Sequence, residues 1–242
     1  FKSNAEISAQ PLALPERWRW ENHAAILATA SFWRQLLNST IVMLCTACAV
    51  TLLASLAAFA VSRMRLPGRE AIFYGFTLGL LFPLTVAMLP LYLSLRSARL
   101  LDTLWGVIVP QIAFGLPGAV LLLRSSFDAM PKELDEAAAI DGCTPLRYLF
   151  GVLLPIMRPA LAAVAVLSMV GSWNSFYLPL LVLTSEANYT LPLGLMQFQG
   201  QYGADLSGIL AFVSLALIPT VGFYLLAERH MVAGLAAGAT SG

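Results

Sequence analysis

Few side chains in this chain could do chemistry on their own, and their spacing excludes most reactions. The two lysines, Lys2 and Lys132, do not follow a glycine, so the chain has no phosphate-binding Gly-x-x-x-x-Gly-Lys-Ser/Thr loop. The two histidines, His23 and His230, stand at opposite ends of the apolar part of the sequence. No Ser/His/Asp set and no pair of carboxylates falls inside an apolar run. We therefore expect no catalytic residue, no metal site and no cofactor bound by this chain.

The polar stretch 128–159 lies between two long apolar runs and carries the most informative spacing. Pro131 suits the first position of a helix, and the acidic residues within 133–136 place negative charge near the positive end of its dipole. The alanines at 137–139 continue this helix as strong helix formers. At about 11 residues the helix would be roughly 16 Å long, which is too short to cross a bilayer.

A tight turn and a second helix are expected next. Asp141 and Gly142 predict the end of the first helix, because glycine accepts the left-handed backbone that follows a helix C-cap. Thr144 and Pro145 predict the N-cap and first residue of a second helix, which would end before Pro155. The stretch therefore predicts a helix–turn–helix that protrudes from a membrane protein.

This stretch resembles the EAA loop of bacterial ABC-importer permeases. The family's pattern is EAA-x3-G-x9-I-x-LP, and the chain matches it with Glu136-Ala137-Ala138, Gly142 and Val152-Leu153-Leu154-Pro155. The only departure is valine for isoleucine at position 152. A lone EAA would be uninformative, but the full spacing between two apolar runs is specific. An Ala-rich amphipathic surface helix is the alternative interpretation.

The composition indicates an integral membrane protein. Hydrophobic residues make up 59% of the chain and charged residues 11%, with a mean hydropathy of +0.78, whereas soluble domains carry about 25% charged residues. A net charge of +1 and the absence of a basic run give no indication of a nucleic-acid partner. We expect an all-α, polytopic transmembrane helical bundle. The resemblance narrows this to a type I ABC importer permease-like fold with a cytoplasmic coupling helix.

Five apolar runs of about 20–26 residues are each long enough to span a bilayer. They cover 36–61, 71–95, 104–123, 160–184 and 208–227. We expect an outer-side interfacial segment at 1–35, a five-helix transmembrane domain at 36–227 with an EAA-like loop at 128–158 and an outer loop at 185–207, and a tail at 228–242. The resemblance implies one more transmembrane helix before Phe1. Pro83 and Pro90 interrupt the second run, so its freed backbone groups should face neighbouring helices or a cavity.

The distribution of Lys and Arg sets the expected orientation. The side that carries the EAA-like loop would hold eight of the 14 basic residues: Arg63, Arg65, Arg69, Arg124, Lys132, Arg147, Arg158 and Arg229. Because basic residues in short loops favour the cytoplasmic side, we expect this loop and the tail in the cytoplasm. The resemblance to bacterial permeases implies that the chain lies in a bacterial inner membrane.

Other segments resemble the carbohydrate-importer permeases of the maltose type, so that the match extends over the whole chain. They are 171–176 in the fourth run, 189–195 and 199–203 in the outer loop, and 228–239 in the tail. That family usually has an acidic residue where Ser175 stands, so no role of that carboxylate applies here. The resemblance implies a second related permease, two ATPase subunits that bind ATP and Mg, an extracytoplasmic solute-binding protein and membrane lipid as partners.

Without a phosphate-binding loop, the energy for transport must come from a partner or from an ion gradient. Ion-coupled carriers usually have ionisable groups within their spans, and the five runs contain no Asp, Glu, Lys or Arg. This favours a non-catalytic permease subunit driven by an ATPase over a carrier or channel working alone. The expected coupling residues are Glu136, Ala137, Ala138, Ala139, Asp141, Gly142, Leu154, Pro155 and Arg229. Glu136 and Asp141 could equally serve only the helix dipole and cap.

An uncharged polar path through the membrane would suit a sugar. The interior polar residues best placed for hydrogen bonds to hydroxyl groups are Gln111, Ser172, Asn174 and Tyr177, and for each an interhelical hydrogen bond is an equal explanation. We expect the chain to form half of the translocation pathway for a sugar or polyol. Glycerol phosphate or a peptide is the alternative cargo, and an anionic cargo would call for Lys or Arg facing the cavity.

Overall fold

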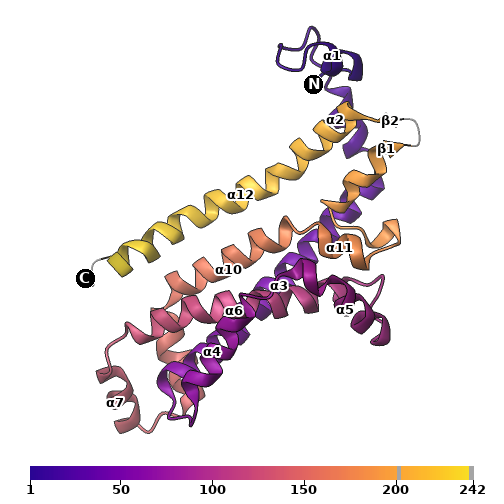
Figure 1. Cartoon of the computed structure of the whole chain (residues 1–242). Helices are drawn as coiled ribbons and strands as arrows, with labels where there is room; N and C mark the ends of the chain where they lie inside the picture. Colours follow the sequence, from indigo (N-terminus) through magenta and orange to yellow (C-terminus); the bar gives the residue numbers. More distant parts are fainter. Residues whose placement is uncertain (201–202, 240–242) are drawn as a thin grey trace.

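The computed structural model describes the backbone of residues 1–200 and 203–239, and the side chains of residues 1–199 and 204–222. Helices build the molecule, as the all-α prediction required (Figure 1). The longest described helices are α3 (Ala30–Arg63), α6 (Leu104–Asp128) and α12 (Leu206–Ala239). The short helix α1 (Asn4–Ala9) lies at one end of the molecule and α7 (Glu133–Ile140) at the other (Figure 1).

The helix α3 forms the centre of the bundle and packs most extensively against α6 and α10 (Arg158–Trp173). Its alanines Ala54 and Ala58 are completely buried, as expected where small residues let helices approach closely. A side chain built at Gly115 on α6 would lie 3.1 Å from Cγ2 of Val50 on α3. Glycine therefore permits the close crossing of these two helices.

Two of the predicted spans are each divided into two helices. The second run is divided into α4 (Arg69–Gly79) and α5 (Leu84–Ser97), whose axes differ by 98°. Pro83 lies at this break, whereas Pro90 is accommodated inside α5. The fourth run ends its first helix at Trp173 and continues in α11 (Tyr177–Val182). An interruption of the second run was predicted from its prolines, whereas the break between Trp173 and Tyr177 in the fourth run was not.

The lengths and composition of the described helices fit a membrane protein. Both α3 and α6 are long and apolar enough to cross a membrane as single helices. The bent pair α4–α5, and the pair formed by residues 145–156 with α10, bring the number to four if each pair is one span. The fifth predicted span falls on α12, of which Leu206–Gly222 is the apolar part with described side chains.

Short elements connect the helices at the two ends of the bundle. After α7 come α8 (Pro145–Tyr148), a π-helical turn (Leu149–Leu153) and α9 (Leu154–Ile156), which bends by 84° into α10. At the other end, two 3₁₀ turns (Glu186–Asn188 and Leu193–Phe198) and a two-residue antiparallel ladder, β1 (Gln199–Gly200) with β2 (Gly203–Ala204), lead into α12. The helix α2 (Glu21–Leu27) precedes α3.

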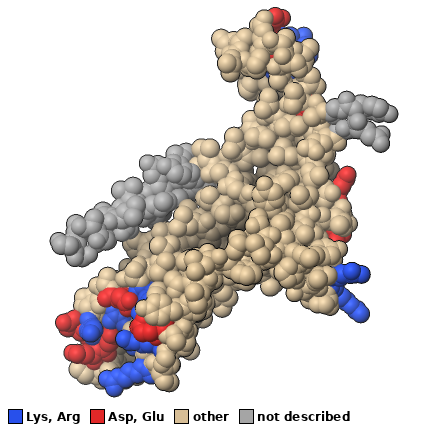
Figure 2. All heavy atoms as spheres, in the orientation of Figure 1, with Lys and Arg blue, Asp and Glu red and all other residues tan. Residues whose placement is uncertain are grey.

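Charged side chains gather at the α7 end of the molecule, and the middle of the visible face is almost free of them (Figure 2). Several of the charges pair across helices. Arg124 on α6 lies 2.7 Å from Glu70 on α4, and its guanidinium stacks 3.8 Å above the ring of Phe73. A charged end beside an apolar belt is the distribution expected for a bundle that crosses a bilayer.

Candidate coupling loop and translocation pocket

The turn after α7 has the geometry that its sequence predicts. Gly142 adopts a left-handed conformation with φ of +65°. The amide of Cys143 donates to the carbonyl of Ala138 at 2.9 Å, and the amide of Gly142 donates to Ala139 at 3.1 Å. These two bonds form a Schellman motif, which satisfies carbonyls at the helix end. The hydroxyl of Thr144 accepts a hydrogen bond from the amide of Arg147, and so caps α8.

The turn presents an exposed tip. Glu136, Ala137, Ala139, Asp141 and Gly142 are all exposed. The apolar side chains of Ile140 and Leu146, on either side of the turn, are 86% and 61% exposed. The sequence analysis did not single out these two residues, because no periodicity marks them.

A buried cation fixes α7 against the bundle. The Arg63 side chain, at the end of α3, is only 6% exposed and donates to a carboxylate oxygen of Asp135 at 2.7 Å. It also donates to the carbonyls of Phe127 and Met130, at the end of α6. The hydroxyl of Tyr148 donates to the second oxygen of Asp135 at 2.7 Å. We call Arg63, Asp135 and Tyr148 the clamp, because they join α3, α6, α7 and α8.

The second helix of the loop is irregular, whereas we expected a regular helix up to residue 154. The amide of Leu154 donates to the carbonyl of Leu149, five residues earlier, which widens the helix into a π turn. Pro155 follows directly and has no N–H to continue the ladder, which is a sufficient reason for the widening. Leu154 itself is half-buried and packs against the core beneath the clamp.

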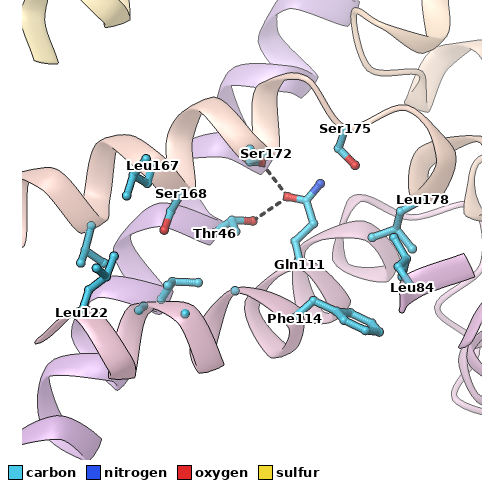
Figure 3. Close-up of a pocket in the computed structure, with 16 residues that line it drawn as sticks. Thr46, Leu84, Gln111, Phe114, Leu122, Leu167, Ser168, Ser172, Ser175 and Leu178 are labelled. Atoms are coloured by element: carbon cyan, nitrogen blue, oxygen red, sulfur yellow. Dashed lines mark hydrogen bonds between the residues drawn. The ribbon is translucent and has the colours of Figure 1, made fainter. Parts of the chain in front are cut away.

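A pocket of about 360 Å³ lies between α3, α6 and α10 (Figure 3). Every residue that lines it is uncharged. Its polar members are Thr46, Gln111, Ser168, Ser172 and Ser175, and its apolar members include Phe114, Leu84 and Leu178. A small-molecule pocket commonly combines such an apolar lining with a few polar groups.

The amide of Gln111 is held from two sides. Its oxygen accepts hydrogen bonds from Thr46 on α3 at 3.1 Å and from Ser172 on α10 at 2.6 Å. Its nitrogen is buried and has no hydrogen-bond partner among the described residues. Two of the four predicted path residues, Gln111 and Ser172, thus meet in one network. Thr46 was missed because a lone hydroxyl in an apolar run carries no sequence signal.

The other two predicted path residues lie outside this pocket. Asn174 is exposed and donates from its side chain to the carbonyl of Val170, one helical turn earlier. Tyr177 is 65% exposed and forms an edge contact with the ring of Phe176. Ser175, by contrast, lines the pocket.

An aspartate anchors the loop that follows α11. Asp102, in the turn between α5 and α6, has a φ of +56° and accepts hydrogen bonds from the amides of Thr184 and Ser185 at 3.0 and 2.9 Å. The Ser185 hydroxyl also donates to it. These bonds, first those from Ser185, hold the pKa of Asp102 well below its usual value. Asn188 completes the anchor by donating to the Asp102 carbonyl at 2.7 Å.

Comparison with known proteins identifies the family. The model of the family described as "Binding-protein-dependent transport system inner membrane component" matches residues 49–232. The chain belongs to this family. It is therefore a membrane permease subunit of an ABC transporter, and not an enzyme. The family predicted from the sequence is confirmed.

The permease is similar to permease proteins of other transport systems over almost its whole length. It is 35% identical to the diacetylchitobiose uptake system permease protein NgcG of Streptomyces coelicolor, over 98% of this chain and 80% of the relative. It is 32% identical to the arabinooligosaccharides transport system permease protein AraQ of Halalkalibacterium halodurans, over 100% of this chain and 88% of the relative.

A solved structure shares the fold of the permease. The crystal structure of a bacterial ABC transporter involved in the import of the acidic polysaccharide alginate contains a chain that matches with a TM-score of 0.81. The match covers 94% of this chain and 85% of that chain, at 21% sequence identity. The importer-permease fold predicted from the sequence is thus confirmed. Permeases of this kind generally work with a partner permease, ATPases and a solute-binding protein.

One predicted coupling residue cannot be placed. The backbone of Arg229 belongs to α12, which continues as a helix to Ala239 through residues expected to form a tail. The side chain of Arg229 lies outside the described residues. Its role in coupling stays a prediction.

Proposed function

We propose that the permease forms half of the translocation pathway of an importer for an uncharged oligosaccharide or another polyol. The observation that carries this proposal is the pocket around Gln111, which offers hydroxyl and amide groups and no charge. Moving an anion into an uncharged site within a membrane is costly. The two relatives named for diacetylchitobiose and for arabinooligosaccharides support a sugar as the cargo.

In this proposal α7 and the turn at Gly142 dock on a cytoplasmic ATPase subunit. Two such subunits bind ATP and Mg, and the chain lies in a bacterial inner membrane with a second permease and an outer solute-binding protein. The exposed Ile140 and Leu146 provide the apolar contact and the acidic residues of α7 the polar one. Charged side chains are concentrated at this end, which supports the proposal that it faces the cytoplasm (Figure 2).

Force would pass from the loop to the pocket through two helices. The helix α6 carries Gln111 and ends at Asp128, and α10 begins at Arg158 and carries Ser172. Residues 111 and 128 are about 25 Å apart along a helix with a rise of 1.5 Å per residue. A rigid movement of α7 would therefore shift the pocket walls. The pocket would then open in turn to one side of the membrane and to the other.

The test is reconstitution of the permease with its partner permease, ATPases and binding protein in proteoliposomes. We expect ATP-dependent uptake of diacetylchitobiose or an arabino-oligosaccharide, coupled to ATP hydrolysis. Uptake of glycerol phosphate or a peptide in place of any sugar would favour the alternative cargo. Solute flux without ATPase subunits would instead favour a carrier or channel.

A further inference from the structure

We propose that Gln111 binds the cargo directly. Its amide nitrogen would donate a hydrogen bond to an oxygen of an uncharged sugar. The inference rests on the proposed function. It adds that this subunit itself, and not only its partner permease or binding protein, contacts the cargo.

The two ends of the Gln111 amide have different surroundings. Two hydroxyls, from Thr46 and Ser172, bind one end, and the other end is buried without a hydrogen-bond partner among the described residues. In Figure 3 the nitrogen points away from both hydroxyls, toward the side of the pocket where Ser175 lies. Exchanging the amide oxygen and nitrogen would leave one end equally unpaired, because the hydroxyls can donate or accept.

A buried amide nitrogen without a hydrogen bond destabilises the protein relative to an amide that is fully hydrogen-bonded. A leucine at this position would avoid that cost, and the neighbouring lining residues are largely apolar. The hydroxyls of Thr46 and Ser172 fix the direction of the amide but leave its nitrogen without a hydrogen bond. Such an arrangement suits a group whose second partner arrives with a ligand.

The pocket lining defines the class of that ligand. The absence of charge among its lining residues disfavours ions, and the hydroxyls of Ser168 and Ser175 add groups that can donate or accept. The ring of Phe114 gives an apolar surface beside them. A molecule with both hydroxyl groups and an apolar ring face, such as a pyranose, matches this combination. The pocket volume of about 360 Å³ also falls in the range of small-molecule sites.

The position of the amide would also connect cargo binding to coupling. Gln111 joins α6 to α3 through Thr46 and to α10 through Ser172. The helices α6 and α10 are the ones that enter and leave the loop containing α7. A cargo oxygen on the amide would therefore stabilise one relative placement of these helices, and this placement would be transmitted to the ATPase end.

The experiment compares Gln111→Leu and Gln111→Glu with the wild type in the complete reconstituted importer. Uptake of radiolabelled diacetylchitobiose and of an arabino-oligosaccharide is measured against concentration, together with basal ATP hydrolysis and subunit assembly. Gln111→Glu keeps an acceptor for Thr46 and Ser172 but replaces the amide N–H donors by a carboxyl group. The matched control is Ser125→Ala on the same helix, whose exposed hydroxyl bonds only the carbonyl of Leu122 among the described residues.

We expect both Gln111 variants to assemble, while the KM for uptake rises roughly three- to tenfold, the equivalent of one hydrogen bond. Ser125→Ala should keep the wild-type KM and the wild-type basal ATP hydrolysis. Unchanged KM values in both variants would overturn the inference and leave the proposed function intact. Loss of assembly in both variants would mean that the pocket holds a partner helix, which also overturns it. If the wild type imports no sugar or polyol at all, the proposed function fails and the inference fails with it.

Discussion

The guanidinium of Arg63 lies 2.7 Å from the carboxylate of Asp135, which joins the end of α3 to α7 across 72 residues of sequence. Because Arg63 also binds carbonyls at the end of α6, this one cation holds the base of the coupling loop. The loop is therefore not a loose protrusion. It is a short helix fixed to the ends of α3 and α6, the two described helices that are long and apolar enough to cross a membrane singly, as transmission of a rigid movement requires.

Breaking this pair should uncouple transport from ATP hydrolysis. In Arg63→Gln the carboxylate of Asp135 loses its cation, and the end of α6 loses a donor, so we expect a loss of about 2 kcal/mol in the free energy of unfolding. The value lies below that for fully buried pairs because the Asp135 side chain is 35% exposed. The measurement is the number of ATP molecules hydrolysed per sugar imported, which should rise.

The control for this experiment is Arg65→Gln, two residues further along, where the side chain is exposed. This variant removes the same charge without touching the clamp. Rescue by Arg63→Lys should be partial, because an ammonium group cannot reach all the acceptors that the planar guanidinium reaches. Equal ATP-to-sugar ratios in Arg63→Gln and wild type would show that the clamp has no part in coupling.

The left-handed turn at Gly142 gives a second prediction. A side chain added there would meet no atom within 4 Å, so the penalty comes from the backbone conformation alone. We expect Gly142→Val to cost roughly 1–2 kcal/mol and to weaken ATPase binding, because the tip would shift. Gly142→Asn should behave almost normally, since asparagine tolerates φ of this sign. Co-purification of the ATPase with each variant measures the effect, and equal binding by both would contradict the role of the turn.

The coupling loop could be predicted from the sequence because its signals are local. Gly142, Thr144 and Pro145 each determine the backbone within a few residues of themselves. The partner of Asp135 could not be predicted, because Arg63 reaches it only after α3 and α6 have packed together. Asp135, whose negative charge was expected to serve the helix dipole, is also a member of the clamp.

The bent spans show a second limit. Pro83 and Pro90 both interrupt an apolar run, yet the chain breaks at Pro83 and stays helical at Pro90. Which proline ends a helix depends on whether neighbouring groups satisfy the freed carbonyl, and this is a property of the packed bundle. For the same reason Gln111 could be selected as an interior polar residue, while its partner Thr46 could not.

The exposed Ile140 gives a third prediction, on the docking surface. Its side chain is 86% exposed beside the turn, and burying it against a partner would contribute roughly 2 kcal/mol. We therefore expect Ile140→Ser to weaken binding of the isolated ATPase subunits about 10- to 30-fold, without changing the thermal stability of the permease. Leu12→Ser, at a 99% exposed position near α1, is the control and should bind normally. Unaltered affinity of Ile140→Ser would place the ATPase contact elsewhere.

The anchor at Asp102 predicts that the loop after α11 opens in acid. Its pKa in the folded protein lies below the unfolded value of about 3.9. The ionised carboxylate thus adds stability above about pH 4, and this contribution is lost as the pH falls toward the folded-state pKa. Hydrogen exchange at the amides of Thr184 and Ser185, corrected for intrinsic rates, should therefore accelerate between pH 5 and about 3. In Asp102→Asn these amides should exchange faster already at pH 7, and the exchange rate should no longer depend on pH in this way. The control Glu186→Gln, at an exposed position, should retain the pH dependence. An unchanged pH profile in Asp102→Asn would mean that another group titrates.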